Sequence, residues 1–220
     1  MNEHSYGPCA VGTLNESYFP VCREYHEVKL AQREKDAVEL GVPMIISEFG
    51  ACVDGATCIT EITSLTDVCD EHLAGWAYWQ FKSFGDLTTT AGTGNEGFYT
   101  EGGWLLTEKV KALARTYVQA AQGTLVSMKF NTSDSEFQAS ILVNLNVTAP
   151  TVIFWSNAYY YLDGYSLSVA DADGNLLQED QDYKAQDLYF SNYIELTIIN
   201  PALNGKVVAL RLSPMQALPY

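Results

Sequence analysis

The sequence predicts two unlike parts, an α/β part up to about residue 123 and an all-β module after it. In the first part, short apolar runs alternate with helical periodicity, a pattern typical of βα units around a parallel sheet. In the second part, apolar residues recur at every second position and no long helix intervenes, which favours a small antiparallel β-sandwich. A chain of 220 residues has room for both, and we place the domains at residues 1–123 and 124–220.

The α/β part contains helices and strands in alternation. Residues 23–40 are expected to form a helix that ends at Gly41, because glycine caps helices and Pro43 forbids continuation. A strand over residues 44–49 follows.

Two more helices and one strand complete this part. A helix is expected over residues 59–72, where apolar residues recur every three or four positions. Residues 75–81 form the next strand. A last helix begins after Thr107 and is expected to stop at Gly123, where the first domain closes.

The all-β part shows alternating apolar residues in separate runs, with turn signals at residues 171–175 and 200–201. The runs cover residues 126–130, 137–143, 165–169, 194–198 and 208–212.

Composition excludes two classes of protein. With 47% hydrophobic and 12% aromatic residues, the chain is too rich in core formers to be disordered. Twelve basic against 27 acidic residues give a net charge of −15, which repels phosphates and anionic membrane surfaces. Nucleic acid is therefore not an expected partner.

The five cysteines all lie in the first third of the chain and include no CxxC pair, so no metal site is expected. We pair Cys9 with Cys22 and Cys52 with Cys58, which leaves Cys69 single. The alternative is that all five are reduced core residues.

Three glycosylation sequons, at Asn15, Asn131 and Asn146, point to a secretory compartment, which also permits disulfides. We expect secretion, or residence in a lysosomal or other endomembrane lumen. The start at Met1 has no signal-peptide pattern, so we expect the front of such a protein to be missing. Polar residues interrupt the uncharged stretch 137–162, and strands are expected there rather than a membrane span.

A Gly-x-Gly-x-x-Gly motif spans residues 92–97, but it lies ten residues beyond the nearest predicted strand, and no helix follows it. Phosphate binding by this motif requires a preceding strand and a following helix N-terminus. We interpret the segment as a glycine-rich loop that binds no nucleotide.

Glu48 is the most informative residue of the strand at 44–49. A carboxylate inside a buried parallel strand costs several kcal/mol unless it is paired or solvated, so Glu48 is expected at the strand's carboxyl end. Barrel and doubly wound enzymes keep their active sites there. By alternation, Glu48 shares a face with Ile46, whereas Ile45 and Phe49 face the helices. The alternative is a carboxylate that only caps the next loop.

Three more residues are candidates for the same site. His4 and Tyr6 are two positions apart, so on a strand they project to one side and can contact one ligand or carboxylate. The alternative is a half-buried pair at a frayed terminus. Small residues on one face of strand 75–81 leave room for the indole of Trp79, which can stack on a sugar ring. The alternative for Trp79 is an ordinary core position.

Three segments that carry these residues follow one another as the last three strands of a glycoside hydrolase family five barrel do, and they resemble those strands. Within that family they most resemble the endoglycoceramidase and glucosylceramidase branch. The segments are residues 4–6, the Ser-Glu-Phe-Gly sequence at 47–50, and residues 76–82. Similarity continues through residues 96–120 and the terminal sandwich. The resemblance implies about three βα units of a TIM (β/α)8 barrel followed by an antiparallel β-sandwich.

The resemblance also implies roles for individual residues. Glu48 would be the nucleophile of a retaining mechanism, Tyr6 would hydrogen-bond and orient it, and His4 would help to shape the sugar subsite. No cofactor is implied, because two carboxyl groups suffice for this reaction. The residues implied to line the rest of the substrate pocket are Trp79, Lys82 and Asp86.

The sequence departs from the family pattern in its acid/base residue, which follows an Asn on the fourth barrel strand. Asn2 and Glu3 imitate that pair, but Glu3 projects away from His4 and Tyr6, so we reject it as the acid. Strands one to five have no counterpart. We therefore expect a fragment of a longer enzyme that is inactive alone; a genuine truncated product is the alternative.

The expected substrate is a glycosphingolipid or a β-glucoside. The alternative function is a non-catalytic carbohydrate- or glycolipid-binding module, or an inactive remnant. In the module, Trp155 and the tyrosines at 159–161 would form an exposed patch for sugars or a peripheral lipid surface. In the other interpretation, these aromatic residues pack between the sandwich and the barrel.

Overall fold

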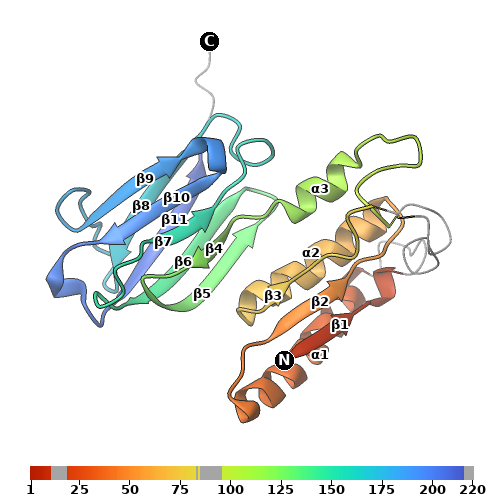
Figure 1. The fold of residues 1–220 in the computed structure, drawn as a ribbon, viewed down its shortest axis with the longest axis horizontal. Coiled ribbons are helices and arrows are strands. Elements are labelled where there is room, and N and C mark those ends of the chain that lie inside the picture. Colours follow the sequence, from red (N-terminus) through yellow and green to blue (C-terminus); the bar gives the residue numbers. More distant parts are fainter. Residues whose placement is uncertain (11–18, 83, 85–95, 216–220) are drawn as a thin grey trace. The chain divides into compact units, whose positions relative to one another are not determined.

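The computed structural model describes residues 1–10, 19–82, 84 and 96–215, which form two compact units, Met1–Leu113 and Ala114–Tyr220 (Figure 1). The boundary thus lies ten residues before the one expected from the sequence. Among the described residues, no helix has the length and apolar character needed to cross a membrane.

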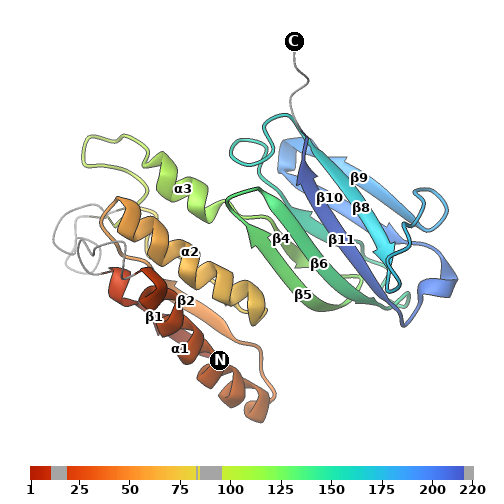
Figure 2. The same ribbon diagram turned by 180° about the vertical axis from the view of Figure 1, so that it is seen from behind.

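The first unit is a three-stranded parallel sheet in the order β1-β2-β3, with α1 and α2 on one face (Figures 1 and 2). Its elements are β1 (Asn2–Ser5), the 3₁₀ helix η1 (Pro8–Ala10), α1 (Phe19–Leu40), β2 (Ile45–Phe49), α2 (Ala56–Glu71), β3 (Gly75–Trp76) and α3 (Thr107–Leu113).

One core joins the helices of this unit to its sheet. Leu30 of α1 and Ile62 and Leu65 of α2 are fully buried against Ile46 and Phe49 of β2. Each helix presents its apolar residues at intervals of three or four, which places them along a single stripe. The opposite face of the sheet is therefore the one left for polar side chains.

Strand β2 differs from the alternation expected for it. Ile46 is fully buried with Phe49, whereas Ile45 is 44% exposed. The cause is a bulge, because Glu3 pairs with Ile46 while the next residue, His4, pairs with Glu48. The extra residue in β2 reverses the facing of the side chains that precede it.

Strand β3 is shorter than the strand expected over residues 75–81. Backbone hydrogen bonds continue from Ala77 to Ile46 and from Trp79 to Phe49. Between those two bonds, β2 advances three residues while its neighbour advances two, so regular pairing stops.

The helix expected to run to Gly123 ends at Leu113 instead. Tyr117–Ala120 forms β4, which pairs with β7 (Thr151–Phe154) of the second unit. The ring of Tyr117 stacks on that of Phe154 at 5.3 Å. The apolar pattern of this stretch is compatible with a helix and with a strand. The contacts with β7 favour the strand.

The second unit consists of two four-stranded antiparallel sheets, in the orders β4-β7-β10-β9 and β5-β6-β11-β8. They share one core, and this arrangement agrees with the expected β-sandwich. Its other elements are β5 (Gly123–Asn131), β6 (Glu136–Val143), β8 (Tyr165–Asp171), β9 (Tyr183–Leu188), η3 (Tyr189–Ser191), β10 (Tyr193–Ile198), η4 (Pro201–Leu203) and β11 (Val207–Pro214).

The aromatic cluster of this unit is internal. Trp155 and Tyr161 are each 1% exposed and Tyr160 is 6% exposed, and all three belong to the sandwich core, with Tyr159 packed against it. The alternative of an exposed aromatic patch is therefore wrong, and the rings are packed inside the sandwich itself rather than between sandwich and barrel. The rings fill the space between the sheets through edge-on contacts, such as that of Trp155 with Tyr165 at 4.7 Å.

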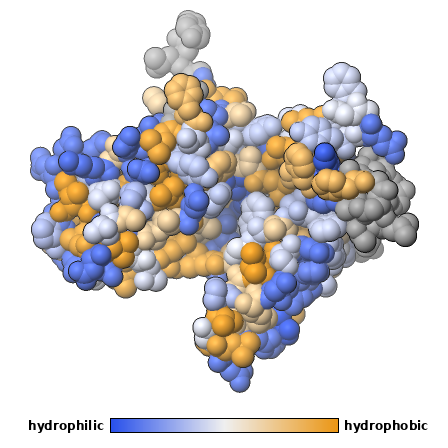
Figure 3. Space-filling view, viewed as in Figure 1, coloured by the Kyte–Doolittle hydropathy of each residue, from blue (hydrophilic) through white to orange (hydrophobic). Residues whose placement is uncertain are grey.

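Apolar side chains do reach the surface elsewhere. Val38 and Leu40 at the end of α1 are 75% and 67% exposed, and Val42 follows at 41%. Figure 3 shows orange, hydrophobic atoms intermixed with blue, hydrophilic ones on the face that it draws. This mixture is ordinary for a protein surface.

Strand β6 provides a matched test of the sandwich core. Ile141 is 3% exposed and its neighbour Leu142 is 40% exposed. Ile141→Ala is expected to lower the free energy of unfolding by about 2–5 kcal/mol, because it leaves a cavity. Leu142→Ala should cost less than about 1 kcal/mol. Chemical denaturation of both variants measures the difference, and equal losses would contradict this core.

Candidate active site

The polar side chains of the first unit meet where its parallel strands end. Carboxyl ends of parallel strands lie at one edge of a sheet, which is the usual place for a site in α/β proteins. His4 comes from β1, Tyr6 follows β1, and Glu48 comes from the end of β2. The structure brings these three side chains together.

One oxygen of the Glu48 carboxylate has two partners. The Tyr6 hydroxyl donates to Oε2 at 2.9 Å, and Nδ1 of His4 lies 3.1 Å from the same atom. The Glu48 side chain is 28% exposed, so the carboxylate is accessible. No described residue donates a hydrogen bond to Oε1, so this side of the carboxylate is open.

Tyr6 is kept in its neutral, donating form. Its pKa is raised above the usual value, first by burial, then by the hydrogen bond to Glu48 and by the negative charges of Glu48 and Glu96. A phenol with a raised pKa stays protonated at physiological pH. It therefore acts on Glu48 as a fixed hydrogen-bond donor.

The bulge in β2 sets the register of this site. Without the extra residue, His4 would lie opposite Ser47; with it, His4 pairs directly with Glu48. Directly paired residues in neighbouring strands project their side chains to the same face. β-Bulges are frequent next to active sites, where they change the direction of a side chain.

Glu96 is a site residue that the sequence reasoning missed. It is 7% exposed, and its Oε2 lies 3.5 Å from Nε2 of Gln80. Burial raises the pKa of Glu96, while hydrogen bonds from Gln80 and Trp79 and the positive charge of Lys109 oppose the rise. Its carboxylate thus holds the indole of the half-buried Trp79. Its place at the end of a glycine-rich loop gave no signal of this role.

Lys109 of α3 connects two loops beside this carboxylate. It is fully buried, and its Nζ donates to the backbone oxygens of Cys52 at 3.0 Å and Gly97 at 3.2 Å. Burial lowers the pKa of Lys109 to about 8, and the charges of Asp54 and Glu96 oppose this shift. The lysine fixes the segments that follow Glu48 and Glu96 in sequence.

Of the two further expected pocket residues, Lys82 and Asp86, the structure describes only the first. Lys82 is exposed, and its Nζ lies 5.4 Å from the ring centre of Phe84. Asp86 lies outside the described residues, as does most of the glycine-rich motif at 92–97.

The cysteine pairs agree with the expectation from the sequence. Disulfides join Cys9 to Cys22 and Cys52 to Cys58, and Cys69 is buried and belongs to neither disulfide. The sulfurs of Cys9 and Cys22 lie near Glu61 in a cluster of metal-ligand type. Because the disulfide uses both sulfurs, we do not assign a metal there.

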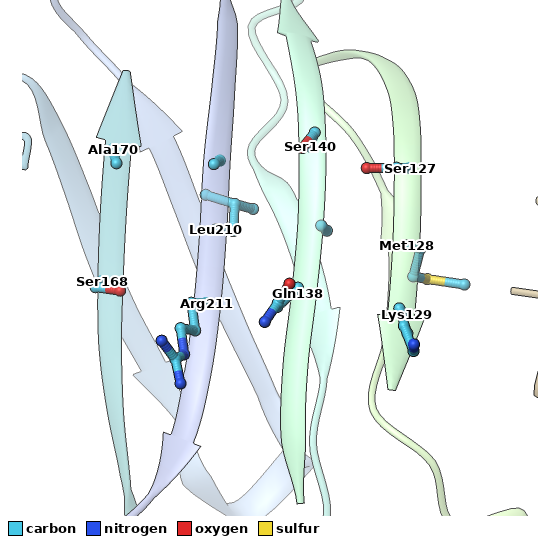
Figure 4. Close-up of a pocket in the computed structure, with 11 residues that line it drawn as sticks. Ser127, Met128, Lys129, Gln138, Ser140, Ser168, Ala170, Leu210 and Arg211 are labelled. Atoms are coloured by element: carbon cyan, nitrogen blue, oxygen red, sulfur yellow. The ribbon is translucent and has the colours of Figure 1, made fainter. Parts of the chain in front are cut away.

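The second unit has a shallow trough of about 380 Å³ on the outer face of β5, β6, β11 and β8 (Figure 4). Lys129, Gln138, Arg211 and Ser168 are paired neighbours and form one row across it. Arg211 is engaged by Glu136 at 2.7 Å. None of the lining residues is aromatic, so the trough lacks a surface on which a sugar ring would stack.

One protein family matches part of the chain. Residues 115–192 match the glycoside hydrolase family 5 C-terminal domain. This match confirms the resemblance to family five that the sequence indicated.

Two of the proteins that the chain resembles are endoglycoceramidases. The chain is 25% identical over 142 residues to an endoglycoceramidase of Cyanea nozakii, over 64% of this chain and 28% of that protein. Endo-glycoceramidase II from Rhodococcus sp. has a similar fold, with a TM-score of 0.65 and 19% identity over 98% of this chain and 43% of that one. The chain thus spans less than half of these relatives.

A second solved structure extends the likeness of fold. Sterylglucosidase 1 of Cryptococcus neoformans matches with a TM-score of 0.63 at 13% identity, over 89% of this chain and 32% of that one.

The buried lysine predicts a pH effect on stability. Between about pH 8 and its ordinary pKa of 10.5, Lys109 is deprotonated when folded but protonated when unfolded. The unfolded state then binds more protons, so this group makes the free energy of unfolding rise with pH. Urea denaturation between about pH 7.5 and 9.5 should show the rise in the wild type and lose it in Lys109→Met.

The control for this experiment is the same substitution at Lys111, a partly exposed lysine of the same helix. Lys111→Met should retain the rise. Identical pH dependence in the wild type and Lys109→Met would show that Lys109 has no depressed pKa.

Proposed function

We propose that this chain supplies the nucleophile half of a retaining β-glycosidase, with Glu48 as the nucleophile. One observation carries the proposal: Oε2 of Glu48 is held by Tyr6 and His4 at a strand's carboxyl end, while no described residue occupies Oε1. A carboxylate held on one side and open on the other is arranged to attack a single substrate atom.

The reaction follows from this geometry. Oε1 of Glu48 would attack the anomeric carbon of the sugar, forming a glycosyl ester as the bond to the leaving oxygen breaks. Water would then hydrolyse the ester and regenerate the carboxylate. The Tyr6 hydrogen bond to Oε2 would hold the carboxylate in place, so that Oε1 keeps its direction toward the sugar.

A retaining mechanism needs a second carboxyl group to protonate the leaving oxygen, about 5–5.5 Å from the nucleophile. Glu3 is not that group, because its Oε1 pairs with Nζ of Lys29 on α1 at 3.0 Å. We propose that β1, β2 and β3 are three strands of a family-five barrel whose fourth strand supplies the acid. Residues 1–220 alone would then be inactive.

The proposed substrate is a glycosphingolipid or a related β-glucoside. Its support is the relationship to endoglycoceramidases, one of which has been solved as a complex with ganglioside GM3. Trp79, oriented by Glu96, would form the floor of the sugar subsite, and Lys82 and Asp86 are proposed to line the pocket further out. The binding-module alternative has lost its support, because the aromatic cluster is buried.

A secretory or lysosomal location is proposed on separate grounds. Both disulfides require an oxidising compartment. Of the two sequons in the described residues, Asn146 is exposed, whereas the side chain of Asn131 donates to Asp134 at 2.9 Å. Asn146 is therefore the better acceptor for a glycan.

Substitution of the nucleophile and of its donor tests the proposed function in the full-length protein. Glu48→Gln should lower kcat for hydrolysis of a ceramide glycoside by about 10³-fold or more, because an amide does not attack the sugar. Tyr6→Phe should lower kcat by about 10- to 100-fold, because it removes one donor that orients the carboxylate.

Glu3→Gln is the matched control, since Glu3 is a carboxylate on the adjoining strand that pairs with Lys29 instead. It should leave kcat within about twofold of the wild type, as expected for a surface pair. Unchanged hydrolysis in Glu48→Gln, with the wild type active, would refute the proposed role of Glu48.

A further inference from the structure

The segment that carries His4 and Tyr6 has a second, buried side. Ser5, Gly7 and Cys9 alternate with the site residues, and all three are buried. His4 and Tyr6 are exposed and point to Glu48. Each residue of the buried set is anchored to a helix, so the segment is fixed from the side opposite to the site.

The anchors form a continuous network. Oγ of Ser5 lies 3.0 Å from Nδ1 of His26, and Nε2 of His26 lies 3.0 Å from Oε1 of Glu61. The Gly7 amide donates to the same Oε1 at 2.7 Å. Ser5, His26 and Glu61 are all 0% exposed. The network therefore joins both neighbours of Tyr6 to a single buried carboxylate.

The protonation pattern follows from the acceptor. Oε1 of Glu61 receives the Gly7 amide, and Nε2 of His26 faces the same oxygen, so Nε2 carries a proton. In the neutral ring Nδ1 is then the acceptor, and the hydroxyl of Ser5 donates to it. Hydrogen bonds thus run in one direction from Ser5 to Glu61.

Serine, histidine and glutamate in this order resemble a nucleophilic triad, but this one does not meet substrate. All three side chains are inaccessible to solvent, and the neighbouring disulfide between Cys9 and Cys22 closes the same region. A nucleophile must reach a substrate atom. The network therefore fixes the backbone of the β1 segment, and in this way it restricts the position of Tyr6.

Gly7 shows how closely the network is fitted. A Cβ at this position would lie 2.7 Å from Oε2 of Glu61 and 2.7 Å from Nε2 of His26. Oε2 of Glu61 is buried and has no hydrogen-bond partner among the described residues. Burial of Oε2 without a partner costs free energy. The contacts of Oε1 with the Gly7 amide and with His26 are the ones that hold the carboxylate in place.

We propose that Ser5, His26 and Glu61 are positioning residues, a buried relay that fixes the hydroxyl of Tyr6 against Oε2 of Glu48. The proposal rests on the proposed function for its catalytic consequence. Tyr6 lies between two anchored residues, so a shift of the Ser5 or Gly7 backbone moves its ring directly. Misplacement by about 1 Å can cost about 100-fold in rate.

The test uses the full-length protein labelled with ¹³C at Cζ of tyrosine, and the Tyr6 resonance is assigned by its loss in Tyr6→Phe. Ser5→Ala should move this resonance in the same direction as Glu48→Gln does, because both weaken the same hydrogen bond. In the enzyme assay, Ser5→Ala should lower kcat by about 10- to 100-fold with little change in KM. Ser5→Thr, which retains the hydroxyl, should restore both.

Thr66→Ala is the matched control. Thr66 is a buried hydroxyl on the same helix as Glu61, and it donates to the Ile62 carbonyl of its own helix at 2.8 Å. This variant loses a buried hydroxyl without touching β1, and it should leave the Tyr6 resonance and kcat unchanged.

Two results would overturn the proposal. One is a Tyr6 resonance that does not move in Ser5→Ala; the other is an equal effect in Thr66→Ala, which would indicate general loosening. If the wild type hydrolyses no glycoside, the proposed function fails by itself. The Tyr6 resonance then still decides whether the relay positions the side chain.

Discussion

The hydrogen bond from Tyr6 to Oε2 of Glu48 depends on contacts made far from either atom. The two residues are 42 positions apart in sequence, and they meet only because β1 and β2 pair in parallel with a bulge in β2. Helices cover the other face of the sheet and anchor the alternate residues of the β1 segment. A short polar contact at the surface thus requires a large apolar and polar arrangement behind it.

Several charged groups near the site are buried, and three of them, Glu61, Glu96 and Lys109, have polar or charged neighbours. Glu61 accepts a backbone amide and faces His26, and Glu96 is opposed by the charge of Lys109. Lys109 in turn donates to backbone oxygens of two loops. An uncompensated buried charge costs several kcal/mol, so loop conformations that break these contacts are disfavoured. Restriction of this kind favours catalysis, since it removes reorganisation from the reaction.

Much of this organisation could be predicted from the sequence. Periodicity located α1, α2 and β2, and in the second unit β5, β6, β8, β10 and β11, because helical and alternating patterns differ clearly over those lengths. The two disulfide pairs agree with the expectation, and the carboxyl end of β2 is where Glu48 was expected. His4 and Tyr6 were grouped correctly on one side, since alternation on a strand is local geometry.

Other features depend on contacts that no local pattern contains. The bulge at Ser47 reverses the facing of Ile45 and Ile46, and a register shift has no sequence signal of its own. Tyr117 fits a helical stripe, but the pairing of β4 with β7 places it in a strand. Glu96 and the Ser5 relay were missed because their partners are distant in sequence. Burial of Trp155 likewise follows from the packing of two sheets.

Covalent labelling tests the central claim, that Glu48 is the nucleophile, most directly. The full-length protein would be incubated with a 2-deoxy-2-fluoro-β-glycosyl fluoride, which slows hydrolysis of the glycosyl ester, and its peptides would then be mapped by mass spectrometry. We expect one added fluorosugar, localised by fragmentation to Glu48 and absent from Glu48→Gln. Inactivation with the sugar on a different carboxylate would contradict it.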